Sequence, residues 1–342
     1  MAVTAGPRNL ITDVDGIRVG NAEDEGALSG VTVVLAGEGA VSGIEIRGGA
    51  PGTRETDVSD PSCLVDEIHG VVLAGGSVFG LAAADAVTKW LAARGTGFAF
   101  REQPHVCPIV QAANLFDLTN GGDKAWGDTP PYHDLGRAAC DDASQDFALG
   151  NAGAGLGALA GAFKGGLGSA SARWEGFTVG AVVAVNPFGS PVNPASLRLW
   201  AAEYELGGEF GLAVERPAGL VGAMDPAAET KASRILEAAA AGQNTTIAAV
   251  ATDAELTPAQ CRRLAIMAAD GMSRAIRPVH TPFDGDVVFT LATGRSGKPA
   301  DPLTLGLLGT VAADCLARAI GRAVCEADSV AGWPGYRERL AT

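Results

Sequence analysis

Runs of apolar residues predict an alternation of strands and helices along much of the chain. Four continuous apolar stretches are typical of buried strands: 71–74, 179–185, 245–252 and 286–292. Helical patterns at 257–276 and 303–327 alternate with the last two strands, and Thr257-Pro258 is a favourable helix start. This β-α-β-α order favours an α/β fold in which sheets are sandwiched between helices.

In the first half of the chain, turns that contain glycine separate the predicted elements. Residues 10–20 alternate like a hairpin with its turn at Asp15-Gly16. Further predicted elements are strands at 30–35, 40–46 and 108–118, a helix that follows Gly75-Gly76-Ser77 and ends near Arg94, and a helix at 135–148. The Gly75-Gly76 turn lacks the lysine of a phosphate loop and the full G-x-G-x-x-G of a dinucleotide fold, so we expect no cofactor there.

The glycine-densest part of the chain is 150–171, which we interpret as ordered backbone close to a ligand rather than as a linker. Residues 203–230 are more polar and predict an exposed excursion, followed by a helix-favouring stretch at 231–241. No internal repeat and no clean domain boundary interrupt the pattern. The sequence therefore predicts one domain, 1–342.

Composition excludes several classes of protein. The 342 residues are 47% hydrophobic and 19% charged, as in globular chains, and the net charge of −14 argues against a nucleic-acid surface. No apolar run reaches the roughly 18 residues of a bilayer span, and the N-terminus does not resemble a signal peptide. Six scattered cysteines suggest free thiols in a reducing cytoplasm, and the four histidines lack metal-ligand spacing.

The bond between Asn244 and Thr245 is the first candidate for chemistry. Thr245 is a hydroxyl residue at the mouth of a buried strand, directly after Gly242-Gln243-Asn244. If this bond breaks, Thr245 gains a free α-amine beside its own hydroxyl, which is one way to activate a threonine nucleophile. A plain turn that enters a strand is the commoner interpretation of these residues alone.

Asp284 and Asp286 form the second candidate, because carboxylates two residues apart at a strand entrance face the same side. Like charges this close separate in pKa, which leaves one carboxyl able to hold a proton near neutrality. A turn that caps the strand, or an aspartate–cation pair, is the alternative. The further ligands of a calcium loop are absent.

Five segments spread over nearly the whole chain share one resemblance. They are Gly242-Gln-Asn-Thr-Thr-Ile, Phe283-Asp-Gly-Asp, Arg47-Gly-Gly-Ala-Pro-Gly-Thr-Arg-Glu-Thr, Leu73-Ala-Gly-Gly-Ser-Val-Phe-Gly-Leu and Lys164-Gly-Gly-Leu-Gly-Ser-Ala-Ser. In their order along the chain they resemble the DmpA/NylC family of self-cleaving N-terminal-nucleophile hydrolases. The resemblance implies a four-layer αββα sandwich, self-cleavage into residues 1–244 and 245–342, and a homo-oligomer, as a tetramer.

The resemblance also implies roles for individual residues. Thr245 is the expected nucleophile, Asn186 is the expected support for the oxyanion, and Asp284 and Asp286 are the expected polar partners. The Asp-Gly-Asp pattern is closer to the amidase branch than to the aminopeptidases. Phe116 stands in the expected substrate pocket, where some members have tyrosine, so a hydroxyl donor is missing.

The sequence does not decide which cationic residue assists the nucleophile. Amidase members carry a lysine just after Ser-Ala-Ser-Ala, and this chain has none in register. Arg173 occupies about that place, and Lys164 lies a few residues earlier. Either residue is a candidate, although an arginine is a poor proton acceptor.

The expected activity is hydrolysis of amide bonds in small peptides or nylon-like 6-aminohexanoate oligomers through an acyl-enzyme. It requires no metal and no organic cofactor. The alternative enzyme is a DmpA-type aminopeptidase or esterase on N-terminal aminoacyl or β-peptide substrates. The alternative from a different class is an uncleaved protein that binds a small ligand through 150–171. We expect a cytoplasmic protein without membrane or nucleic-acid partners.

Overall fold

The structure is a computed structural model that describes residues 2–101, 104–212, 230–231 and 244–341. Its strands are β1 Thr4–Ala5, β2 Arg18–Asp24, β3 Ser29–Ile46, β4 Thr53–Arg54, β5 Glu67–Ala74, β6 Phe98–Ala99, β7 Val106–Cys107, β8 Val110–Asn114, β9 Leu159–Ala160, β10 Phe163–Lys164, β11 Gly166–Trp174, β12 Phe177–Asn186, β13 Thr245–Thr252 and β14 Val287–Ala292. Its helices are α1 Ala83–Ala92, α2 Tyr132–Asp142, α4 Pro258–Ala275, α5 Pro302–Cys325 and α6 Tyr336–Ala341. Short 3₁₀ turns are η1 Ile11–Asp13, η2 Asp57–Ser59, η3 Ser77–Ala82, η4 Gly153–Gly155 and η5 Trp200–Tyr204.

The long strand β3 connects the two halves of a ten-stranded sheet. The strand order is β1-β11-β12-β13-β14-β3-β5-β8-β4, with β2 also paired to β3. The first part of β3 pairs with β2 and β5, whereas 41–46 pairs with β14. The register shifts between Leu35 and Ala40, where Gly37 and Gly39 have positive φ angles of 58° and 118°. The two strands predicted at 30–35 and 40–46 are therefore one irregular strand.

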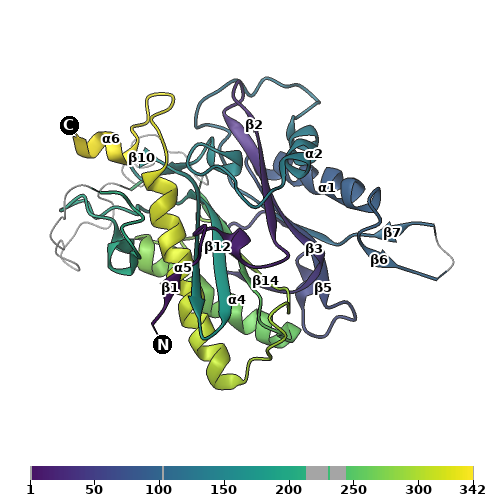
Figure 1. The fold of residues 1–342 in the computed structure, drawn as a ribbon. Helices are drawn as coiled ribbons and strands as arrows, with labels where there is room; N and C mark the ends of the chain where they lie inside the picture. Colours follow the sequence, from purple (N-terminus) through teal and green to yellow (C-terminus); the bar gives the residue numbers. More distant parts are fainter. Residues whose placement is uncertain (1, 102–103, 213–229, 232–243, 342) are drawn as a thin grey trace.

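The molecule has four layers, two of strands between two of helices, and alternate residues of each strand pack on opposite faces. In β13, Ile247 and Ala249 belong to an apolar cluster between the two halves of the sheet, whereas Val250 packs in the cluster that contains α4 and α5. In β5, Val71 belongs to the same central cluster and Val72 packs with α1 and α2. Figure 1 shows the two helix pairs on opposite sides of the strands. The predicted α/β fold, with sheets between helices, is confirmed.

The most apolar helix, α5, lies in the core. Among the described residues it is the one helix long and apolar enough by length and composition to cross a bilayer, although Asp314, Arg318 and Arg322 interrupt its apolar sequence. However, 67% of its most apolar window is buried, and α5 packs against α4, β11 and β12. These contacts are those of a core helix.

Most elements of the second half lie where the sequence predicts them, since β13 matches 245–252 and the ends of α4, β14 and α5 differ from the prediction by at most two residues. Thr257 caps α4 by accepting a hydrogen bond from the Gln260 N–H. The stretch at 150–171 is ordered, as expected. The predicted helix at 231–241, apart from Lys231, and most of the excursion at 203–230 lie outside the described residues.

The hairpin predicted at 10–20 is wrong. Gly16 does form a turn, with a φ of 91°, but this turn connects η1 to β2. The hairpin partner of β2 is β3, and the connection between them is 25–28. Two other elements are displaced, because β8 is shorter than 108–118 and α2 begins and ends before the predicted 135–148.

Candidate active site

Thr245 is the first residue of β13 and is buried, with 4% of its surface exposed. The antiparallel register of β12 and β13 sets Asn186 directly opposite it. The Thr245 hydroxyl donates a hydrogen bond to the carbonyl oxygen of Asn244, and the Gly285 N–H donates to the same oxygen at 3.2 Å. The carbonyl of the bond predicted to break therefore has two donors, one of which is the predicted nucleophile.

The Asp284–Asp286 turn lies beside this bond, because β14 runs parallel to β13 and both strands begin at the same edge of the sheet. Asp284 accepts hydrogen bonds from the Phe188 N–H and from both the N–H and the hydroxyl of Thr281, at 2.6–3.0 Å. Asp284 also forms a backbone bridge with Asn244. Both aspartates are almost fully buried, at 0% and 1% exposure, so their hydrogen-bond partners fix their positions.

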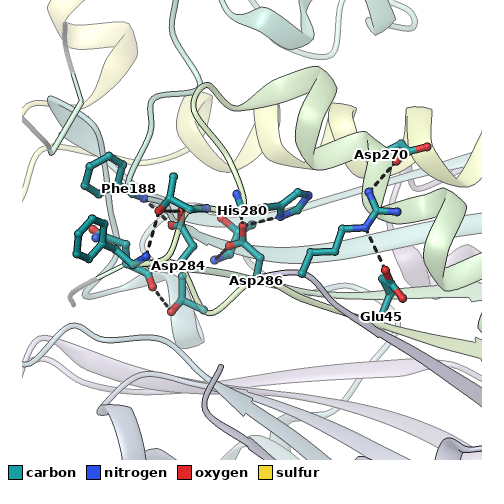
Figure 2. A network of polar contacts seen from close by, with 12 residues as sticks. Glu45, Phe188, Asp270, His280, Asp284 and Asp286 are labelled. Atoms are coloured by element: carbon teal, nitrogen blue, oxygen red, sulfur yellow. Dashed lines mark hydrogen bonds and ion pairs between the residues drawn. The ribbon is translucent and has the colours of Figure 1, made fainter. Parts of the chain in front are cut away.

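Asp286 connects the nucleophile strand to His280. One carboxylate oxygen accepts from the Thr246 N–H at 2.8 Å, and the other accepts from the N–H and Nδ1 of His280 at 3.0 and 2.8 Å. Figure 2 shows Asp284 on the side of Phe188 and Asp286 on the side of His280. His280 Nε2 is buried and has no hydrogen-bond partner among the described residues. Sequence reasoning gave His280 no role.

Burial and the neighbouring charge of Asp286 raise the pKa of the Asp284 carboxyl above its usual range. This is the direction that the sequence predicts for one member of the pair. Protonated Asp284 has an acceptor at hand, because the Thr281 hydroxyl lies 2.6 Å from its Oδ2. The turn can therefore store a proton next to the bond between Asn244 and Thr245.

The glycine-rich segment after β3 covers the aspartate turn. The N–H groups of Arg47 and Gly48 donate to the Asp286 carbonyl, and the Ala50 N–H donates to the Asp284 carbonyl. A Cβ on Gly48 would lie 2.3 Å from the Asp284 carbonyl oxygen, so only glycine allows this approach. The guanidinium of Arg47 is held by Glu45 and Asp270, as Figure 2 shows, which anchors the segment.

Asn186 is fully buried, and both ends of its amide are engaged. Its Nδ2 donates to the Phe116 carbonyl at 3.0 Å, and its Oδ1 accepts from the Leu159 N–H at 2.9 Å. The Lys231 ammonium also donates to Asn186, to Oδ1 at 3.0 Å and to the main-chain oxygen at 3.2 Å. Lys231 thus brings a buried cation to the residue opposite Thr245.

Sequence reasoning did not assign Lys231 to the site. It treated this residue as the beginning of a helix-favouring stretch, and its one distinguishing feature in the sequence is its place shortly before the predicted cleavage bond. The two cations that it did name are elsewhere. Arg173 is exposed and pairs with Thr178, roughly 26 Å along the strand from the end of β12 that carries Asn186.

Lys164 is buried inside the glycine-dense segment. Its Nζ donates to the carbonyls of Gly155, Ala158 and Gly165 at 2.8–3.0 Å, and none of its hydrogen bonds in the described part of the chain reaches Thr245. Burial lowers the pKa of the Lys164 ammonium to about 7. In this position the ammonium holds the turns of 150–171 together.

A pocket of about 390 Å³ opens in front of Thr245. Phe116, which the sequence places in the substrate pocket, lines it together with Asn114, Asn244 and Phe283. No charged side chain is among its described lining residues. The pocket has the size of a small-molecule site, and its polar surface comes from neutral hydroxyl and amide groups.

A protein-family model described as peptidase family S58 matches residues 9–337. An uncharacterized aminopeptidase of Mycobacterium tuberculosis is 46% identical over 349 residues, which cover 96% of this chain and 97% of the relative. A 6-aminohexanoate-oligomer endohydrolase of Paenarthrobacter ureafaciens is 30% identical over 309 residues, with coverage of 87% and 79%.

Among solved structures, the L-aminopeptidase D-Ala-esterase/amidase of Ochrobactrum anthropi superposes with a TM-score of 0.68 at 23% identity. The superposition covers 99% of this chain and 92% of that protein, which is described as a new variant among the ntn hydrolase fold. The likeness in fold therefore extends over the whole chain, including both strands that carry Asn186 and Thr245.

Proposed function

Because this chain belongs to peptidase family S58, and is therefore a hydrolase of peptide or amide bonds, we propose that Thr245 is its nucleophile, released by self-cleavage after Asn244. The resemblance to DmpA/NylC hydrolases is confirmed by the family match and the named relatives. One observation carries the proposal: the Thr245 hydroxyl and the Gly285 N–H both donate to the carbonyl oxygen of Asn244.

In the proposed self-cleavage, Thr245 Oγ1 attacks the carbonyl carbon of Asn244, and its proton passes to the departing nitrogen. The bond between carbon and nitrogen breaks, so that an ester joins Asn244 to the Thr245 oxygen and the α-amine of Thr245 becomes free. Water then hydrolyses the ester and leaves a carboxylate on Asn244. The Gly285 N–H supports the negative charge that develops on the carbonyl oxygen.

The same hydroxyl then acts on the substrate. The new α-amine of Thr245 accepts the hydroxyl proton, Oγ1 attacks the substrate amide, and the leaving amine takes the proton as the acyl-enzyme forms. Water releases the acyl group. Asp286 holds Thr246 in place by accepting a hydrogen bond from the Thr246 N–H, and the raised pKa of Asp284 favours a proton on that carboxyl nearby. Asn186, opposite Thr245, is the proposed support for the substrate oxyanion.

The proposed substrates are small peptides or nylon-like oligoamides, and a DmpA-type aminopeptidase is the second candidate. The relative of Mycobacterium tuberculosis is named an aminopeptidase, which favours the second candidate. The relative of Paenarthrobacter ureafaciens is named an oligomer endohydrolase, which favours the first. The cytoplasmic location and the homo-oligomeric assembly stay predictions that rest on the resemblance.

Mass spectrometry of the purified protein tests the proposal. We expect two fragments, 1–244 and 245–342, and no split in Thr245→Ala. The matched control is Thr246→Val, which keeps the shape of the adjacent strand residue and should split normally. Thr245→Ser, which keeps the hydroxyl, should split as well.

Three results would contradict the proposal. A wild-type chain of full mass after long incubation would exclude self-cleavage, and ligand binding by such a chain would favour the uncleaved binding protein. A split in Thr245→Ala would exclude this nucleophile. A large fragment lighter by one water would mean that the Asn244 side chain had cyclised instead of Thr245 attacking.

A further inference from the structure

Asn114 is the last residue of β8 and lies at the edge of the pocket that contains Thr245. Its N–H donates to the Gly52 carbonyl at 2.9 Å, and β8 runs parallel to β5 with Asn114 beside Ala74. A Cβ on Gly52 would lie 2.5 Å from Asn114 Oδ1, so the glycine leaves room for this amide. Two strands and one glycine thus fix where the amide lies.

The side-chain amide of Asn114 has no hydrogen-bond partner in the part of the chain that the structure describes, although only 7% of the residue is exposed. Unlike the amide of Asn244, that of Asn114 is not sealed from the pocket, so water or a bound substrate can pair with it. The buried amide of Asn186, by contrast, has a protein partner at each end. Asn114 therefore differs from Asn186 by facing a cavity with unused hydrogen-bonding capacity.

The rest of the pocket wall is neutral. Its other described polar side chains belong to Thr53, Ser77, Asn244 and Thr245, and the remainder are apolar. Arg54, next to the pocket, is paired with Asp85 at 2.6 Å, so its charge is balanced. A substrate ammonium placed in this pocket would lose hydration, and none of the described lining residues offers it an opposite charge.

From these observations we infer that Asn114 binds a neutral amide of the substrate, and that the enzyme acts on internal or N-acylated amides rather than beside a free amine. A carboxamide is both donor and acceptor and can make two hydrogen bonds with another amide. This inference rests on the proposed function and selects between its two substrate classes, because an aminopeptidase must accommodate an ammonium next to the bond it cuts.

A matched pair of chromogenic substrates tests the inference on the processed enzyme: alanine p-nitroanilide and N-acetylalanine p-nitroanilide. We expect wild-type kcat/KM to be at least about tenfold higher for the acetylated substrate. Asn114→Asp has the same shape but carries a charge, and it should shift the ratio by at least about tenfold toward the free amine. Gln145→Glu, an exposed substitution of the same charge, is the control and should leave the ratio unchanged.

Calorimetric binding of alaninol and N-acetylalaninol, which lack the amide bond that the enzyme would cut at alanine, keeps the test independent of turnover. A wild-type preference for the free amine, or a ratio that Asn114→Asp does not move, would overturn the inference. Chain splitting reports on Thr245 alone, so a failure of the proposed nucleophile and a failure of this substrate assignment give different results.

Discussion

The two sides of Thr245 differ in how completely their polar groups are paired. On the aspartate side, every carboxylate oxygen of Asp284 and Asp286 accepts at least one hydrogen bond from a neighbouring segment. On the pocket side, the amides of Asn114 and Asn244 have no partner among the described residues, and Asn244 is only 2% exposed. The aspartate carboxylates are therefore satisfied by the protein itself, although Thr246 Oγ1 and His280 Nε2 beside them have no partner among the described residues, whereas the two pocket amides are not.

This difference suggests different roles: the aspartate side positions the reacting groups, and the pocket side recognises the substrate. The paired carboxylates of Asp284 and Asp286 fix the turn that carries Gly285 and thereby the donor to the Asn244 carbonyl. Unpaired groups destabilise the empty site and are useful only when another molecule or another state of the chain satisfies them. For Asn244 the proposed cleavage supplies that state, because the residue then becomes a chain end that can leave its buried position.

The largest effect, on the rate of self-cleavage, is expected from Gly285→Ala, because the turn on the aspartate side approaches Thr245 closely at this residue. An added Cβ would lie 2.8 Å from both Thr245 Oγ1 and the Ala50 carbonyl oxygen. The hydroxyl or the turn must then move, and a displacement of about 1 Å reduces rates by roughly 100-fold. We expect self-cleavage, followed by mass spectrometry over time, to slow by about that factor.

The control for this substitution is Gly306→Ala in α5, where an added Cβ meets nothing within 4 Å. It should cleave at the wild-type rate. If Gly285→Ala also cleaved normally, the close contact between this turn and the hydroxyl would have no part in the reaction.

A smaller effect is expected on the free energy of unfolding, which should fall more for a substitution on the aspartate side than for one on the pocket side. Asp286→Asn replaces an oxygen that accepts main-chain N–H groups with an NH₂ group, so that donors face donors at Thr246 or His280. Each donor left unpaired costs about 1–3 kcal/mol of unfolding free energy. Asn114→Ala removes no hydrogen bond within the described chain, and we expect a change within about 1 kcal/mol. Urea unfolding of both variants in the uncleaved Thr245→Ala background measures the difference.

Equal losses of stability in the two variants would contradict the comparison, because Asn114 would then be part of the scaffold. The Thr245→Ala background matters for this reading. It keeps every chain in one piece, so that a change in unfolding free energy reports on the substituted residue and not on the extent of cleavage.

The sequence predicted those parts of the site that depend on local pattern and neighbouring strands. Thr245 begins a strand of continuous apolar and β-branched residues, and Asp286 directly precedes the next one, so the parallel pair β13–β14 brings them together. The contacts of Lys231, His280 and Asn114 depend on segments that only the tertiary fold brings near. No spacing in the sequence marks such partners, because their functional signal is burial and pairing.

The smallest effect concerns Lys164, which the sequence named as a possible helper of Thr245. Its pKa of about 7 in the folded chain is below the usual 10.5 of the unfolded chain, because burial disfavours the charge. Between these values the unfolded chain binds more protons, so the Lys164 contribution to the free energy of unfolding rises with pH, by at most about 1.4 kcal/mol per pH unit. Below pH 7 both states are protonated and this contribution no longer changes.

We therefore expect the difference in unfolding free energy between Lys164 and Lys164→Met, both in the Thr245→Ala background, to increase in favour of lysine as the pH rises above 7. Lys89→Met, at an exposed position on α1, is the matched control and should show no such slope. The three carbonyls that hold the Nζ make Lys164 part of the scaffold rather than a proton acceptor for Thr245. If Lys164→Met instead left the pH slope unchanged and abolished self-cleavage in the Thr245 chain, the lysine would belong to the reacting side.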